Sequence, residues 1–427
     1  MEILNFLINN IFGSAPIFLA LIAFVGLLLQ KKPMSEILSG TFKTAIGVVI
    51  LQKGCGILLE GIIPLATSIA SINPTQTVAP SMGADIFMDQ YGFEIGVAML
   101  GGFLINLLVA RFTKWKTVFL TGHMLYWFPF VFTGVGVAAG LSGGMLILTS
   151  SIFTALYYVV APNIIRPYVK EVTGDDSFTL GHPSVSLALI GGFLAKKFGD
   201  KSKSTEDIKF PKSVSFLREI SITGSIVIML VYAVVTIILA SMGIDYIAVY
   251  GLADASGLFN FIVISGITFG AGLTVLLLGV RMMIAEIVPA FTGFQETIIP
   301  NAIPAYDCPL LFPFAPNAVI IGFLISTVTS IITIVVTSSM GIFQYTVIPI
   351  VITCFFECGT ATVVGNALGG RRGAYIAAAV SGVVMIFLMG FSLNFVDTTI
   401  ADWMIGNGGQ DFSLWAIIQG LLLGVFK

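Results

Sequence analysis

The sequence predicts an all-α polytopic membrane protein, and three observations support this fold class. The 427-residue chain is 57% hydrophobic and only 10% charged, whereas a soluble protein carries about 25% charged residues. Its mean hydropathy is +1.01. Apolar runs of about 18 or more residues, the length that a transmembrane helix needs, recur from one end of the chain to the other. These runs are continuous rather than alternating, so a β-barrel is not expected.

In the first half of the chain, five apolar runs are expected to be spans. They cover 11–30, 41–69, 95–110, 118–141 and 144–165. The second run is broken by Gln52-Lys53-Gly54, and the fourth begins with the polar sequence Thr121-Gly122-His123. The longest amphiphilic stretch follows at 171–212 and contains a short apolar piece at 185–195.

The second half is expected to add six spans, which brings the total to about eleven. They cover 220–242, 259–280, 318–336, 345–356, 374–393 and 413–426. The span that ends at residue 280 is followed by Arg281 and a mixed segment, 282–316.

The distribution of lysine and arginine predicts the orientation in the membrane. The loops 73–94, 244–257 and 395–412 contain acids but no lysine or arginine, and the basic residues fall at the opposite ends of the spans. Cytoplasmic loops carry the excess of basic residues. The N-terminus is therefore expected outside and the C-terminus in the cytoplasm. Lys43 and Lys53 fall within a span, where they would extend to the interface or line a cavity.

The number of spans also predicts an inverted repeat within a single transporter unit, 1–427. Five spans precede the 171–212 stretch, so the second half starts on the other side of the membrane from the first. The repeats would cover about 1–212 and 213–427, and each has a polar, hairpin-like piece, at 177–195 and 301–320. Inverted repeats with re-entrant segments near the midplane are typical of secondary transporters.

Asp307 is the first candidate for a binding residue. It lies in Tyr306-Asp307-Cys308-Pro309, an acidic position within apolar sequence, and prolines on both sides forbid a continuous helix. A carboxylate at such a break marks a substrate or ion site by default. The alternative is a carboxylate that only satisfies freed backbone N–H groups. As a binding group, it could accept two hydrogen bonds from the hydroxyls of a sugar or polyol.

The chain has only two histidines, His123 and His182, and each follows a glycine. An imidazole both donates and accepts hydrogen bonds, which suits hydroxyl recognition or proton transfer. The alternative is that each ring braces the local backbone.

Other polar positions give weaker predictions about function than Asp307 and the two histidines do. Cys354 and Cys358 lie one helical turn apart without enough further ligands for a metal site, so buried free thiols are expected. Glu286 could line a pathway or pair with Arg281 or Lys53. No nucleotide-binding motif and no nucleophile–base pair is evident in the sequence, so neither a cofactor nor catalysis by this chain alone is expected.

Several motifs together resemble a known family. They are Thr41-Phe42-Lys43-Thr44-Ala45-Ile46-Gly47, Leu51-Gln52-Lys53-Gly54, Thr121-Gly122-His123, Gly279-Val280-Arg281-Met282 with Ala285-Glu286, Asp307-Cys308, and Phe314-Ala315-Pro316-Asn317-Ala318. They occur in order over nearly the whole chain. The sequence thus resembles the ascorbate-type membrane component, enzyme IIC, of the bacterial phosphoenolpyruvate-dependent phosphotransferase system. Galactitol-type transporters are more distant relatives.

This resemblance implies an inner-membrane homodimer of eleven-span subunits that moves substrate by an elevator mechanism. Core and scaffold domains would be interleaved in the sequence. The sugar would be phosphorylated at the inner face by a separate IIB protein bearing a phosphocysteine, which IIA, the histidine carrier HPr and enzyme I recharge. No fused IIA or IIB domain is expected.

The resemblance also implies a set of substrate-binding residues. His123, His182 and Asp307 match the family's motifs, and Thr77 matches a Thr-Tyr pair in which Val78 replaces the tyrosine. Where the family has glutamines after its two histidines, this chain has Trp127-Phe128 and Pro183-Ser184-Val185. The expected site therefore comprises His123, His182, Asp307, Thr77, Ser184 and Trp127.

The expected substrate is ascorbate or a related small sugar or polyol. The alternative function is a proton-coupled secondary transporter of a small polar solute, with Asp307 as the proton carrier.

Overall fold

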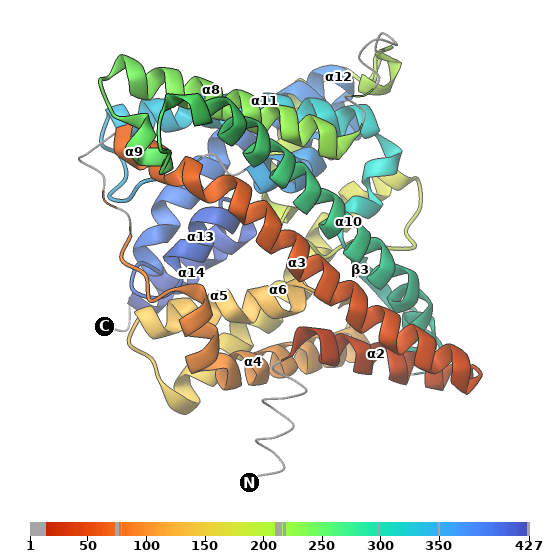
Figure 1. Ribbon diagram of the computed structural model, residues 1–427. Helices are drawn as coiled ribbons and strands as arrows, with labels where there is room; N and C mark the ends of the chain where they lie inside the picture. Colours follow the sequence, from red (N-terminus) through yellow and green to blue (C-terminus); the bar gives the residue numbers. More distant parts are fainter. Residues whose placement is uncertain are drawn as a thin grey trace.

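The computed structural model describes residues 14–72, 77, 79–209, 216, 219–297, 299–348 and 351–424. Most of them are helical, and they form a bundle of long helices (Figure 1). Seven helices of this described part are long and apolar enough to cross a bilayer, namely α3, α4, α6, α8, α10, α11 and α12. The predicted all-α polytopic class is confirmed at this level. The count of eleven crossings stays a prediction.

In the described part of the first half, seven helices and two very short strands follow one another. They are α2 (Ala15–Leu29), α3 (Met34–Ile72), α4 (Ala84–Phe112), β1 (Thr117–Phe119), α5 (Met124–Ala138), α6 (Gly143–Thr173), β2 (Thr179–Leu180), α7 (Val185–Phe198) and the 3-10 helix η2 (Thr205–Asp207). Helix α3 runs unbroken through Gln52-Lys53-Gly54, where only the apolar pattern of the expected span is interrupted. Gln52 and Lys53 are exposed on the outside of that helix.

The second half contains the longest helices of the described chain. Its main elements are α8 (Ile220–Ser241), α9 (Tyr246–Tyr250), α10 (Leu258–Thr297), β3 (Ile303–Tyr306), α11 (Pro316–Ser339), α12 (Val351–Ser392), α13 (Ala401–Asn407) and α14 (Asp411–Gly424). The expected span 259–280 lies within helix α10, which continues past Arg281. Helix α12 joins two predicted spans, and non-helical backbone at Gly369 and Gly370 divides it.

Helices α3 and α10 run side by side across the molecule (Figure 1) and approach each other closely. Their contact contains a glycine every seventh residue of α3, at Gly47, Gly54 and Gly61. A Cβ on Gly54 would lie 2.3 Å from the backbone nitrogen of Leu276. Small residues at such spacing let two membrane helices pack backbone against backbone.

An ion pair links these two helices. Lys43 Nζ on α3 lies 3.0 Å from Glu286 Oε1 on α10. The sequence had offered Arg281 or Lys53 as the partner of Glu286, and the structure gives Lys43 instead. A carboxylate and an ammonium group near hydrocarbon cost less when paired.

Three very short strands, which the sequence did not predict, form a parallel sheet in the order β1-β3-β2. Thr117 of β1 is in register with Ile303 of β3, and Thr179 of β2 with Ala305. Asn106 of α4 covers the outer edge of β1, because its amide donates to the Thr117 carbonyl at 3.1 Å and accepts from the Phe119 N–H at 2.9 Å. Enclosure of this kind would allow extended backbone to lie within a membrane, where lipid offers no hydrogen bonds.

Candidate substrate site

The residues that follow the three strands carry the polar site. His123 lies four residues beyond β1, His182 two residues beyond β2, and Asp307 directly after β3. The strands are parallel, so their carboxyl ends meet at one edge of the sheet and bring the three side chains together. Gly181 allows this approach: its N–H donates to the Tyr306 carbonyl at 2.8 Å, and a Cβ there would lie 2.9 Å from the Ala305 oxygen.

The two imidazoles and the carboxylate face one another at distances that leave their hydrogen-bonding capacity free. His182 Nε2 lies 3.5 Å from Asp307 Oδ1, and His123 Nδ1 lies 3.8 Å from Asp307 Oδ2. Both distances exceed that of a good hydrogen bond. His123 Nδ1 has no hydrogen-bond partner among the described residues. A substrate hydroxyl could therefore bond to these groups without displacing an existing contact.

Two local contacts orient the carboxylate and one imidazole. Asp307 Oδ1 accepts a hydrogen bond from the Cys308 N–H at 2.7 Å. His182 Nδ1 lies 2.6 Å from Ser184 Oγ, which leaves the Nε2 atom directed toward Asp307. The sequence predicted that Asp307 stands at a break within a membrane-crossing helix. It lies instead after strand β3 and caps a short 3-10 helix, Cys308–Leu310.

A small cavity of about 60 Å³ lies beside these three residues. It is lined by Leu51, His123, Met124, Trp127, His182, Leu276, Asp307, Ile352, Phe356, Glu357, Trp403, Asn407, Gln410 and Phe412. Sites for small ligands usually offer about 300 Å³ or more. This conformation is therefore closed around its polar groups, and a sugar needs side-chain or helix movement to enter.

Trp127 provides an aromatic wall of the cavity together with Trp403. The two ring centroids are 4.9 Å apart. Phe128, the next residue, is fully buried elsewhere and stacks on Tyr157 at 3.6 Å between centroids. An apolar aromatic wall with a few convergent polar groups is the usual composition of a small-molecule site.

Two of the expected site residues lie outside the cavity lining. Thr77 is exposed and forms an isolated parallel bridge with Tyr345. Ser184 is buried and contacts the site through His182. Val78, the neighbour of Thr77, lies outside the described residues.

Besides Phe356 and Phe412, four polar or aromatic residues of the lining were not expected from the sequence, namely Glu357, Trp403, Asn407 and Gln410. Glu357 had a recognisable signal, because it is an acid within an apolar run, as Asp307 is. The predicted span ended at 356, one residue before it. Trp403 lies within α13, Asn407 lies at its end and Gln410 lies beyond it. All three belong to a segment that was predicted to be an external loop.

Asp411 was also missed, although it positions the loop that carries His182. It is 1% exposed. Its carboxylate accepts hydrogen bonds from Tyr157 Oη at 2.6 Å and from the backbone N–H groups of Val185 and Ser186 at 3.1 and 2.8 Å. A carboxylate at the first turn of α7 also interacts favourably with the helix dipole.

The donor set could also hold a cation. The ligand atoms of His123, His182 and Asp307 lie within 4.8 Å of one another. Two imidazoles and a carboxylate are ligand types that suit Zn²⁺, and three such ligands leave one coordination position open.

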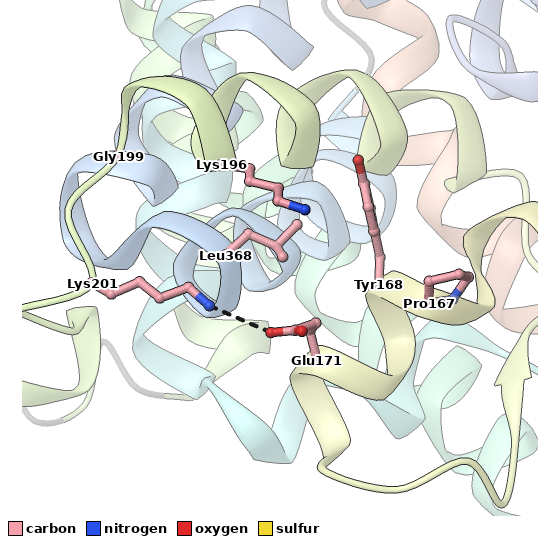
Figure 2. A pocket seen from close by; sticks show the side chains of 7 residues that line it. All are labelled: Pro167, Tyr168, Glu171, Lys196, Gly199, Lys201 and Leu368. Carbon is pink, nitrogen blue, oxygen red and sulfur yellow. Dashed lines mark hydrogen bonds and ion pairs between the residues drawn. The ribbon is translucent and has the colours of Figure 1, made fainter.

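A second, more open cavity of about 320 Å³ lies between α6, α7 and α12. Figure 2 shows Lys196 at the top of the cavity, Lys201 at the left and Glu171 below them. Lys201 Nζ and Glu171 Oε2 form an ion pair at 3.4 Å. The side chain of Lys196 extends toward Tyr168 and Leu368 in the same view. The cavity therefore has a basic rim.

The fold and the enclosed site define a class of protein. A polytopic helical bundle that surrounds two imidazoles and a carboxyl group at interrupted segments is a membrane transport protein.

The chain belongs to the EIIC-GAT family, described as the PTS system sugar-specific permease component, because the model of that family matches residues 10–410. PTS denotes the phosphotransferase system, and the protein is therefore a multi-pass sugar permease component of it. The ascorbate-specific PTS system EIIC component of Mycoplasma pneumoniae (strain ATCC 29342 / M129 / Subtype 1) is 26% identical over 465 residues, which cover 97% of this chain and 70% of that protein. The resemblance found in the motifs is confirmed.

Proposed function

We propose that this permease carries ascorbate or a related small sugar or polyol, which binds between His123, His182 and Asp307. The observation that carries the proposal is the convergence of these three side chains, with free bonding capacity, at one edge of the sheet. Trp127 would pack against the apolar face of the sugar. Ser184 would act through His182, and Thr77 enters the proposal through its matching motif alone.

Transport would follow from movement between two groups of helices. Helices α2, α3, α8 and α10 pack against one another, and α7, α11 and α12 form a second group. The second group carries Glu357 and the loop of His182, and the closed cavity needs such a movement to admit a sugar. We infer an elevator-like displacement of this core against the first group as scaffold, in a homodimer with the N-terminus outside. The inverted repeat and re-entrant hairpins belong to the same proposal.

Capture of the sugar would depend on separate proteins. A IIB protein with a phosphocysteine would phosphorylate the sugar at the cytoplasmic side, and IIA, HPr and enzyme I would recharge it. The chain itself would position the sugar without catalysing the transfer.

Uptake by membrane vesicles tests this function. Without phosphoenolpyruvate, we expect only slow, non-concentrative flux of the sugar, because nothing removes it from the inner side. With phosphoenolpyruvate and the soluble phosphotransferase proteins inside, the sugar phosphate should accumulate. Accumulation of unmodified sugar driven by a pH gradient, and lost in Asp307→Asn, would favour the proton-coupled alternative instead.

A second prediction concerns the basic rim of the cavity in Figure 2. Its residues lie on the side that the positive-inside pattern places in the cytoplasm. We expect Lys196→Glu to slow phosphoenolpyruvate-dependent uptake about tenfold at low salt, because rim charges mainly set the rate of association with a charged partner. The effect should weaken at high salt.

Lys114→Glu is the control for Lys196→Glu, because Lys114 is also exposed and basic but lies outside this cavity. Sugar binding by both variants should equal that of the unmodified protein. Equal slowing by both substitutions, or slowing independent of salt, would contradict a role of this rim in docking the phosphoryl donor.

A further inference from the structure

Glu357 lines the cavity and holds a buried carboxyl oxygen that has no partner among the described residues. It lies on α12, on the face that also supplies Ile352 and Phe356 to the lining, and it is 3% exposed. Its Oε2 atom has no hydrogen-bond partner among the described residues. An unsatisfied buried polar group costs about 1–3 kcal/mol, so such a group in a native protein calls for an explanation.

A purely bracing role does not explain this side chain. Asp411 is equally buried, and both of its carboxyl oxygens accept hydrogen bonds from α6 or α7. Asp411 is thus an acid whose carboxylate is hydrogen-bonded through both oxygens and holds neighbouring segments in place. Glu357 differs because one oxygen stays unbonded beside the groups that would bind the sugar.

The charges around the cavity restrict the kind of substrate. Among the described lining residues there are two carboxyl groups, those of Asp307 and Glu357, and no lysine or arginine. Burying an anion without a fixed cation is costly. A neutral hydroxyl group avoids this cost, because it can donate to a carboxyl oxygen or accept from a carboxylic acid.

We propose that Glu357 is a specificity-determining residue, which hydrogen-bonds one hydroxyl of a neutral polyhydroxylated substrate. This rests on the proposed function, because it places the substrate beside His123, His182 and Asp307. A site built to bond a particular hydroxyl strongly rejects the analogue that lacks it. Glu357 therefore selects both the position of one hydroxyl and an uncharged substrate over the ascorbate anion.

Calorimetric titration of the full-length protein in lipid nanodiscs tests this assignment. Galactitol, sorbitol, xylitol and ascorbate are titrated separately, and at least one neutral polyol should bind about tenfold more tightly than ascorbate. Monodeoxy derivatives of the tightest polyol are then compared between the unmodified protein and Glu357→Leu.

One derivative should bind the unmodified protein about tenfold more weakly than its parent, as expected for one lost buried hydrogen bond. In Glu357→Leu the loss of affinity of this derivative relative to its parent should fall below about twofold, while the losses measured for the other derivatives stay unchanged. A merely structural role would weaken all compounds by the same factor. Glu357→Gln keeps the side-chain volume and replaces the leucine variant in this test if that variant does not fold. It should change the loss of affinity of the same derivative only. Glu60→Leu, at an exposed glutamate of α3, is the control.

The outcomes separate this assignment from the proposed function. Tighter binding of ascorbate than of every polyol would overturn the role of Glu357 alone. The same conclusion would follow if every deoxy derivative lost as much affinity in Glu357→Leu as in the unmodified protein. Binding of none of the four compounds would overturn the proposed function with it.

Discussion

Asp307→Asn should weaken sugar binding about 100-fold, because hydrogen bonds to a charged group contribute roughly 1.5–3 kcal/mol each. The substitution keeps the size of the side chain but replaces one acceptor oxygen with a donor. That donor would face an imidazole nitrogen, since His182 Nε2 and His123 Nδ1 lie 3.5 and 3.8 Å from the two carboxyl oxygens. Affinity for the tightest-binding polyol or for ascorbate, measured by calorimetry in nanodiscs, checks the result.

Asp89→Asn is the matched control, because Asp89 is an exposed acid on α4 outside the cavity lining. It should bind sugar as the unmodified protein does. Thermal unfolding of Asp307→Asn should stay close to that of the control, since the asparagine can still accept the Cys308 N–H bond. Unchanged affinity in Asp307→Asn would show that the sugar binds elsewhere.

The sequence identified the central polar residues for a physical reason. A carboxyl group in apolar sequence has few ways to avoid the cost of burial, so Asp307 could be recognised without a structure. The two histidines were recognised because the chain holds no others. The same reasoning applied to Glu357 would have added it to the site, but the boundary of the predicted span fell one residue too early.

The sheet could not be predicted, because its strands depend on tertiary pairing. A strand of two to four residues has no usable alternation, and β1 pairs with β3 from the other half of the chain. The polar residues of 395–412 were predicted as an external loop for a related reason. Acids without basic neighbours look like a solvated loop, whereas Asp411 is buried against α7.

Polar side chains interrupt the apolar sequence pattern at two places where the helix itself is continuous. Gln52 and Lys53 interrupt the apolar run of the second expected span, but their side chains are exposed while the backbone of α3 stays helical. Arg281 marks the end of an apolar run, and α10 continues past it to Thr297. A polar side chain interrupts an apolar pattern without interrupting a helix, because helical hydrogen bonds are made by the backbone.

Asp411→Ala should lower the free energy of unfolding by about 3 kcal/mol and weaken sugar binding as well. The substitution leaves the Tyr157 hydroxyl and the N–H groups of Val185 and Ser186 without their acceptor, and each unsatisfied buried donor costs about 1–3 kcal/mol. These donors flank the loop of His182, so the imidazole should lose its position. Thermal unfolding in nanodiscs and calorimetric binding measure the two effects.

The comparison with Asp397→Ala isolates the contribution of burial. Asp397 also accepts a hydrogen bond from a tyrosine, Tyr345, at 2.8 Å, but it is only partly buried. Water can replace the lost acceptor there, so its unfolding free energy should change by less than about 1 kcal/mol. Asp411→Asn keeps one acceptor oxygen and should fall between the two variants. If Asp411→Ala and Asp397→Ala were equally stable, the clamp on α7 would contribute nothing, and another contact would have to hold His182 against Asp307.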